Sequence, residues 1–178
     1  QCVGSRNDEH PYCSRVCCTR AVRNATRLKE WYPETEVTVL YRDLRTYSLR
    51  ERTYQAAREA GVHFIRFEPG REPRVTTEGD RLLVHVREPI LDADLALAAD
   101  LVVLSTGIVA ETENNDRLGK LFKVPLNADG FFLEAHAKLR PVEFATEGVY
   151  LAGLAHGPKS LDESLAQALA AASRACTV

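Results

Sequence analysis

Residues 36–67 read EVTVLYRDLRTYSLRERTYQAAREAGVHFIRF, and this stretch decides the fold class. Its first six residues, 36–41, and its last six, 62–67, are rich in the β-branched and aromatic side chains typical of strands. Between them, residues 48–60 form a charged helical pattern that stops at Gly61, where a helix-ending glycine is expected. The strand–helix–strand order predicts an α/β protein with a parallel, doubly wound sheet.

The flanking segments extend this pattern in both directions. Spacings of three and four between apolar residues predict a helix over residues 13–30, and residues 74–88 read as a polar antiparallel hairpin. The apolar runs Leu101–Leu104 and Val149–Ala152 are typical of strands buried in a parallel sheet. A final helix over about 161–174 is expected to bury an apolar stripe made of Leu161, Leu165, Ala168, Leu169 and Ala172.

The composition limits the classes of function. Apolar residues make up 45% of the chain and charged residues 27%, with a net charge of -2, which is typical of a folded globular protein and argues against a nucleic-acid-binding surface. No apolar run approaches the roughly 20 residues that span a bilayer, so we expect no membrane span. The sequence has no Met and opens directly on Cys2, so we expect it to be a piece of a longer polypeptide.

Four of the five cysteines, Cys2, Cys13, Cys17 and Cys18, lie within the first eighteen residues. This crowding is typical of a metal or reactive site in a reducing compartment, here the cytoplasm. On the predicted helix Cys13 and Cys17 share one face, and Cys18 lies about 100° round the axis. Cys2 reaches the same point if the intervening loop folds back, so four thiolates can converge on an iron–sulfur cluster.

Three other readings of these cysteines are open. Cysteine is often a small buried apolar residue, and structural zinc also uses thiolate ligands, although adjacent ligands at positions 17 and 18 fit zinc sites poorly. A disulfide requires suitable geometry and an oxidising compartment. Cys176, in the small-residue tail of the final predicted helix, is expected to be structural or a bystander.

Two loops follow the apolar runs, where ligands bind in open α/β sheets. The first is Ser105-Thr106-Gly107, and the second is Gly153-Leu154-Ala155-His156-Gly157-Pro158-Lys159. Ser160 and Glu163 form a capping-box signature, so the final helix would present its positive end, beside Lys159, to an anionic flavin or a phosphate. Either loop can also be an ordinary turn, with His156 hydrogen-bonded within the loop and Lys159 solvated.

Several stretches of the chain resemble the heterodisulfide reductase A-subunit family. They are Gln1–Arg6, Tyr12–Cys18, Val39–Tyr47, Leu101–Gly107, Asp129–His136 and Ala152–Lys159. The resemblance covers nearly the whole chain, and the cysteine motif and the Ala-His-x-Pro-Lys loop are its most specific parts.

The resemblance implies a Rossmann-like FAD/NAD(P)-binding fold of the thioredoxin-reductase type, incomplete here, with a small antiparallel hairpin. Residues 1–100 would be an inserted NAD(P)-like domain carrying the cysteine cluster, and residues 101–178 the C-terminal part of the FAD-binding domain. It also implies a 4Fe–4S cluster held by Cys2, Cys13, Cys17 and Cys18. FAD would contact Ser105, Thr106, Gly107, Gly153, Leu154, Ala155, His156, Pro158, Lys159 and Ser160, with Lys159 as the catalytic residue.

The implied function is that of an oxidoreductase subunit that passes electrons between FAD and iron–sulfur clusters, with flavin-based electron bifurcation in the parent protein. Its partners would be other subunits of a heterodisulfide-reductase-like complex and ferredoxin-type carriers. One alternative is a cofactor-free docking or scaffold module of the parent complex. Another is a pyridine-nucleotide-dependent flavoprotein domain, which is disfavoured because Gly4 is followed by the bulkier Ser5 and Arg6 where a pyrophosphate loop needs glycine.

Overall fold

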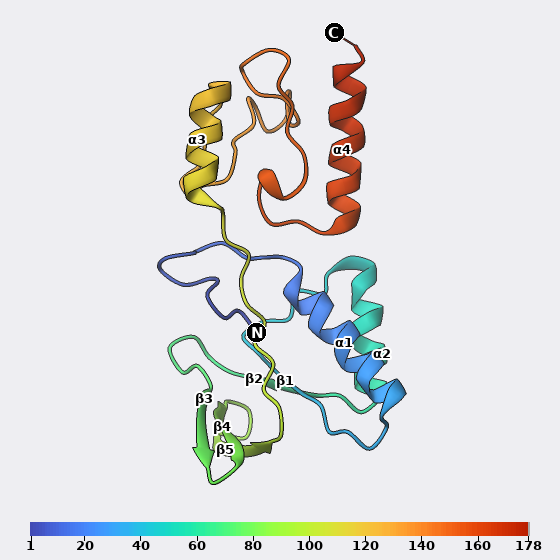
Figure 1. The fold of residues 1–178 in the computed structure, drawn as a ribbon. Coiled ribbons are helices and arrows are strands. Elements are labelled where there is room, and N and C mark those ends of the chain that lie inside the picture. Colours follow the sequence, from blue (N-terminus) through green and yellow to red (C-terminus); the bar gives the residue numbers. More distant parts are fainter. Residues whose placement is uncertain (178) are drawn as a thin grey trace. The chain divides into compact units, whose positions relative to one another are not determined.

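The computed structural model describes residues 1–177, and the chain divides into two compact units. Unit 1 comprises residues 1–4 and 17–107, and unit 2 comprises residues 5–16 and the chain from Ile108 onward. Helices occur together with a small parallel sheet and a small antiparallel sheet, which confirms the predicted mixed α/β class (Figure 1). The Rossmann-like assignment stays a prediction. Within residues 1–177, no helix combines the length and the hydropathy needed to cross a membrane.

Unit 1 contains the strand–helix–strand element predicted from residues 36–67. In chain order its elements are α1 (Cys17–Trp31), β1 (Thr38–Tyr41), η1 (Ser48–Arg50), α2 (Glu51–Glu59) and β2 (His63–Arg66). Strands β1 and β2 pair in parallel, with Thr38 opposite His63 at the start of the ladder. Gly61 has a φ of 83°, the left-handed conformation expected of a glycine that ends a helix. The prediction is therefore confirmed for this element.

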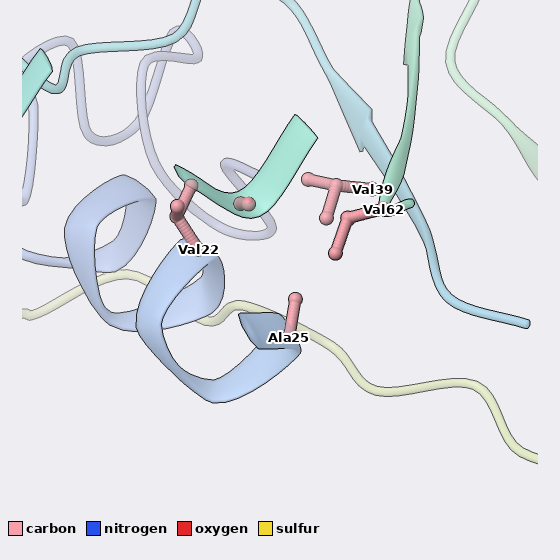
Figure 2. Close-up of a cluster of buried hydrophobic side chains, with 5 residues drawn as sticks. Val22, Ala25, Val39 and Val62 are labelled. Carbon is pink, nitrogen blue, oxygen red and sulfur yellow. The ribbon is translucent and has the colours of Figure 1, made fainter. Parts of the chain in front are cut away.

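A small apolar core joins the helices of unit 1 to the parallel pair. Helices α1 and α2 lie side by side (Figure 1). Val22 and Ala25 project from α1 towards Val39 of β1 and Val62 (Figure 2), and Ala57 of α2 completes the cluster. Burying a side chain of this size contributes roughly 1.5–3 kcal/mol. This packing holds the middle of α1 against β1.

The predicted hairpin over residues 74–88 is also confirmed, and a third strand extends it to a three-stranded sheet. It consists of β3 (Arg74–Glu78) and β4 (Arg81–Glu88), and β5 (Ala93–Ala99) pairs antiparallel with β4. The strand β5 was not predicted, because its alanine-rich sequence carries little strand propensity.

Two predictions for unit 1 are wrong. The apolar run Leu101–Leu104 is not a buried strand, since Leu101 is 76% exposed and Val103 is 79% exposed. The helix predicted over residues 13–30 begins only at Cys17, because Arg15 adopts a left-handed backbone with φ of 63° that no α-helix accepts. Cys13 therefore lies before α1, and the helix face it was expected to share with Cys17 does not exist.

Unit 2 has α3 (Thr112–Phe122), η2 (Gly153–Ala155) and α4 (Leu161–Ala175). Its core contains Val124, Phe132, Phe144 and Leu151. The run Val149–Ala152 contributes buried Leu151 and one antiparallel bridge, Glu143 with Tyr150, rather than a strand. Helix α3 was not predicted.

Helix α4 confirms the predicted extent and corrects the predicted buried face. The stripe of Leu161, Leu165 and Leu169 is exposed, with Leu161 at 86%. The residue that α4 buries is Ala171, and the half-buried Gln167 lies four residues before it. The apolar periodicity correctly indicated a helix, but it did not indicate which face packs within this chain.

Candidate cofactor-binding residues

Cys17 and Cys18 occupy the first turn of α1. The Cys18 side chain is buried, and its Sγ lies 4.0 Å from the carbonyl oxygen of Asp43, just after β1. At the same end of β1, the backbone nitrogen of Gln1 donates a hydrogen bond of 2.8 Å to the carbonyl of Leu40. Unit 1 therefore gathers Cys18 and the segment that carries Cys2 at the carboxyl end of β1, the edge of a parallel sheet where ligands bind.

The start of α1 favours negative charge beside these two thiols. The first backbone N–H groups of a helix have no intrahelical partner and carry a partial positive charge. A hydrogen bond with Cys17, together with burial, raises the pKa of Cys18, so in the metal-free chain this thiol holds its proton. Thiols bind metal as thiolates, so ligation by Cys18 would release that proton.

Cys13 lies in unit 2, in a loop anchored by two buried hydroxyls. The Ser14 Oγ accepts a hydrogen bond of 2.8 Å from the backbone N–H of Ile108 and lies 3.4 Å from the Oγ of Ser5. The backbone N–H of Arg15 donates to the Cys13 Sγ at 3.2 Å. These contacts hold the loop in place without any helix.

The donor chemistry fits an iron–sulfur cluster in part. Within residues 1–177, the five cysteines form no disulfide. Cys17 and Cys18 are adjacent in the first turn of α1. In the part of the chain that the structure describes, no three His, Cys, Asp or Glu side chains lie close enough together to hold a metal ion. The four-cysteine ligand set therefore stays a prediction.

The burial of the thiols predicts their relative reactivity in the metal-free chain. Cys18 is 4% exposed and its pKa is raised, whereas Cys176 is exposed. Because the thiolate is the reactive form, iodoacetamide is expected to label Cys176 at least tenfold faster than Cys18. Peptide mass spectrometry over a time course measures both rates, and equal rates would contradict the buried position of Cys18.

The loop Ser105–Gly107 pairs with the residue that follows Cys2. The backbone N–H of Val3 donates to the carbonyl of Ser105 at 3.1 Å, and the N–H of Gly107 donates to the carbonyl of Val3 at 2.8 Å. Thr106 between them forms a parallel bridge with Val3 and is itself exposed. Unit 1 thus brings a residue predicted to ligate the cluster next to residues predicted to contact FAD.

In unit 2, Lys159 is held by its own loop and is not a freely solvated cation. Its Nζ donates to the carbonyl oxygens of Gly153 at 2.9 Å and Gly157 at 3.5 Å. Burial lowers the pKa of Lys159 and the nearby Arg15 lowers it further, while Glu163 and Glu134 oppose both effects.

The capping box at the start of α4 is confirmed. The backbone N–H and the Oγ of Ser160 both lie within 2.9 Å of the Glu163 Oε2. Arg15 forms an ion pair with Glu163, and its guanidinium also donates to the Pro158 carbonyl at 3.4 Å. The predicted contact residue Ser160 therefore already uses its hydroxyl in capping. Two further predicted contact residues, Leu154 and Ala155, are exposed in η2.

His156 is hydrogen-bonded on both ring nitrogens. Its Nε2 lies 2.8 Å from the Glu134 Oε2, and its Nδ1 lies 2.8 Å from the Gln167 Nε2. Burial raises the pKa of Glu134. Hydrogen bonds from its own backbone N–H and from His156 lower this pKa by more, so the net shift is downward. Neither Glu134 nor Gln167 was predicted as a site residue. The one available signal was the position of Glu134 within the stretch Asp129–His136.

No protein-family model matches the chain. Curated proteins do match it along nearly its whole length. The chain is 40% identical over 99% of its length to an iron-sulfur A subunit of CoB--CoM heterodisulfide reductase from Methanopyrus kandleri. It is 42% identical over 98% of its length to the A subunit of the H(2):CoB-CoM heterodisulfide,ferredoxin reductase from Methanothermobacter thermautotrophicus. The iron-sulfur A subunit of the CoB--CoM heterodisulfide reductase from Methanocaldococcus jannaschii is 41% identical over 97% of the chain.

The chain spans 27% of the length of each of these three relatives. Over nearly its whole length, this chain is therefore homologous to one segment of the heterodisulfide reductase A subunits.

Proposed function

We propose that this chain is part of an oxidoreductase subunit that passes electrons between FAD and an iron–sulfur cluster. The observation that carries the proposal is the backbone pairing of Val3 with Ser105 and Gly107, which joins the segment of Cys2 to a loop expected to meet FAD. The names of two relatives contain the words "iron-sulfur" and "ferredoxin reductase", which supports iron–sulfur electron transfer. The fold of the parent protein would be of the thioredoxin-reductase type.

The proposed cluster ligands are Cys2, Cys13, Cys17 and Cys18. A 4Fe–4S cluster supplies one-electron redox chemistry when it is bound. The chain contributes the thiolates and the N-terminal end of α1, whose first N–H groups offset the negative charge of a thiolate-ligated cluster. The buried hydroxyls of Ser14 and Ser5 fix the loop that presents Cys13.

The proposed flavin contacts are the loops 105–107 and 153–160, with Lys159 as the catalytic group. When bound, FAD can accept or donate a hydride and can exchange electrons singly or in pairs. The role of Lys159 is to hold an ammonium at a fixed place through the Gly153 and Gly157 carbonyls, so that negative charge on reduced flavin is stabilised. Electron bifurcation, ferredoxin-type carriers, partner subunits of a heterodisulfide-reductase-like complex and a cytoplasmic location belong to the same proposal for the parent protein.

A cofactor-free docking or scaffold module is the second candidate. The observation that favours it is the exposed apolar stripe of Leu161, Leu165 and Leu169 on α4, which would pack against more protein.

An anaerobic spectroscopic experiment separates these candidates. The chain is purified and reconstituted with iron and sulfide under anaerobic conditions, and its absorbance is recorded before and after addition of dithionite. The proposal predicts a broad band near roughly 400 nm that bleaches on reduction, together with an electron paramagnetic resonance signal of the reduced cluster. A colourless sample that stays silent on reduction would reject the electron-transfer function and favour the docking module.

A further inference from the structure

A chain of hydrogen bonds in unit 2 fixes the orientation of the Gln167 side chain. The backbone N–H of Gly153 donates to the Gln167 Oε1 at 2.9 Å, so this atom must be the amide oxygen. The other end of the amide is therefore the NH₂ group, which can only donate. That group lies 2.8 Å from the His156 Nδ1.

This orientation determines which nitrogen of His156 carries a proton. A nitrogen that faces an NH₂ donor must be an acceptor, so the His156 Nδ1 is unprotonated. The Nε2 then holds the ring proton and donates it to the Glu134 carboxylate at 2.8 Å. Protonation of Nδ1 would place two donors against each other, unless the amide of Gln167 turned over and released the Gly153 N–H.

Gly153 also connects the Gln167 side-chain amide to Lys159. The carbonyl of Gly153 accepts the Lys159 Nζ, while the N–H of Gly153 donates to Gln167. Both peptide groups next to Gly153 are thus tied to side chains, at a residue whose left-handed backbone has φ of 68°. The charged groups of this network are Glu134, which accepts from His156, and Lys159.

We infer that Gln167 is a positioning residue that keeps His156 neutral, with its proton on Nε2, and holds Gly153 where its carbonyl binds Lys159. The loop 153–160 then carries Lys159 as its one charge, because His156 is kept from becoming a second cation. A role of neutral His156 in electron transfer rests on the proposed flavin contact, whereas the protonation state of His156 does not.

Nitrogen NMR on the ¹⁵N-labelled chain tests the inference without flavin or iron. Long-range proton–nitrogen correlations distinguish the two neutral histidine tautomers from imidazolium, and a His156→Gln spectrum assigns the ring. In the wild-type chain around neutral pH, His156 is expected to be neutral with its proton on Nε2. In Gln167→Glu, the new carboxylate still accepts from Gly153 and now also accepts from Nδ1, so His156 is expected to convert to imidazolium at that pH.

The control is Gln55→Glu, which makes the same charge change on α2, in unit 1, and is expected to leave the His156 signals unchanged. A wild-type proton on Nδ1, or a Gln167→Glu chain in which the ring of His156 is unaltered, would overturn the inference. If the variant fails to fold, a wild-type proton on Nδ1 still overturns the inference. Failure of the chain to form an iron–sulfur cluster on anaerobic reconstitution would overturn the proposed function and leave this result standing.

Discussion

Cys18→Ser is expected to remove most of the iron that the chain retains after anaerobic reconstitution. Serine is nearly isosteric with cysteine, so it fits the buried site in which Cys18 Sγ lies 4.0 Å from the Asp43 carbonyl oxygen. The fold is therefore expected to survive while a thiolate ligand is lost. Changing a residue that merely orients metal ligands already costs about 10–100-fold in metal affinity, so losing a ligand is expected to cost at least as much.

The matched control is Cys176→Ser, which removes an exposed thiol near the end of α4. Iron per chain, measured by inductively coupled plasma mass spectrometry, should equal the wild-type value in this control. Circular dichroism establishes whether both variants are folded. If folded Cys18→Ser retained iron at the wild-type level, Cys18 would not be a ligand, and its burial would be purely structural.

Phe144→Ala is expected to destabilise unit 2 by about 3–5 kcal/mol, the usual cost of truncating a buried phenylalanine. Phe144 is 3% exposed and packs edge-to-face on Phe132, with ring centroids 6.0 Å apart. The backbone N–H of Phe132 donates to the carbonyl of Ala155 at 2.9 Å, so this core also supports the loop that carries His156 and Lys159. Urea denaturation followed by circular dichroism measures the loss.

Phe122→Ala makes the same truncation at the end of α3, where the side chain is 49% exposed. Because little buried area is lost there, its cost is expected to stay below about 1 kcal/mol. Equal destabilisation by the two variants would contradict the core assigned to unit 2.

The sequence predicted those elements whose pattern depends on local chemistry. The strands around Tyr41 and Phe64, the helix between them and its end at Gly61 follow from propensity and from glycine at a left-handed position. The capping box of Ser160 and Glu163 was equally readable, because both of its hydrogen bonds join residues three apart.

Features set by distant contacts could not be predicted in this way. Leu101–Leu104 reads as a buried strand, but burial requires a sheet whose two faces are both covered, and a local pattern does not report whether that cover exists. The start of α1 depends on the left-handed Arg15 and on Ser14, whose hydroxyl binds the N–H of Ile108, ninety-four residues away.

In the candidate site too, residues with a local sequence pattern were predicted, and residues that reach the site from distant positions were not. Lys159 and His156 were found because they lie in one short loop that resembles a family motif. Glu134 and Gln167 reach His156 from positions 22 and 11 residues away, and neither has a distinctive local pattern. Conversely, a helix face shared by Cys13 and Cys17 was predicted from spacing alone and is wrong, since Cys13 precedes the helix.

Elemental analysis of the anaerobically prepared chain tests the central claim most directly. Iron, acid-labile sulfide and zinc are measured per chain in the same sample. The proposed thiolate-ligated cluster predicts about four iron and four sulfide per chain, with zinc in trace amount. One zinc per chain without iron, or a chain free of both metals after reconstitution, would contradict the claim that these cysteines serve electron transfer.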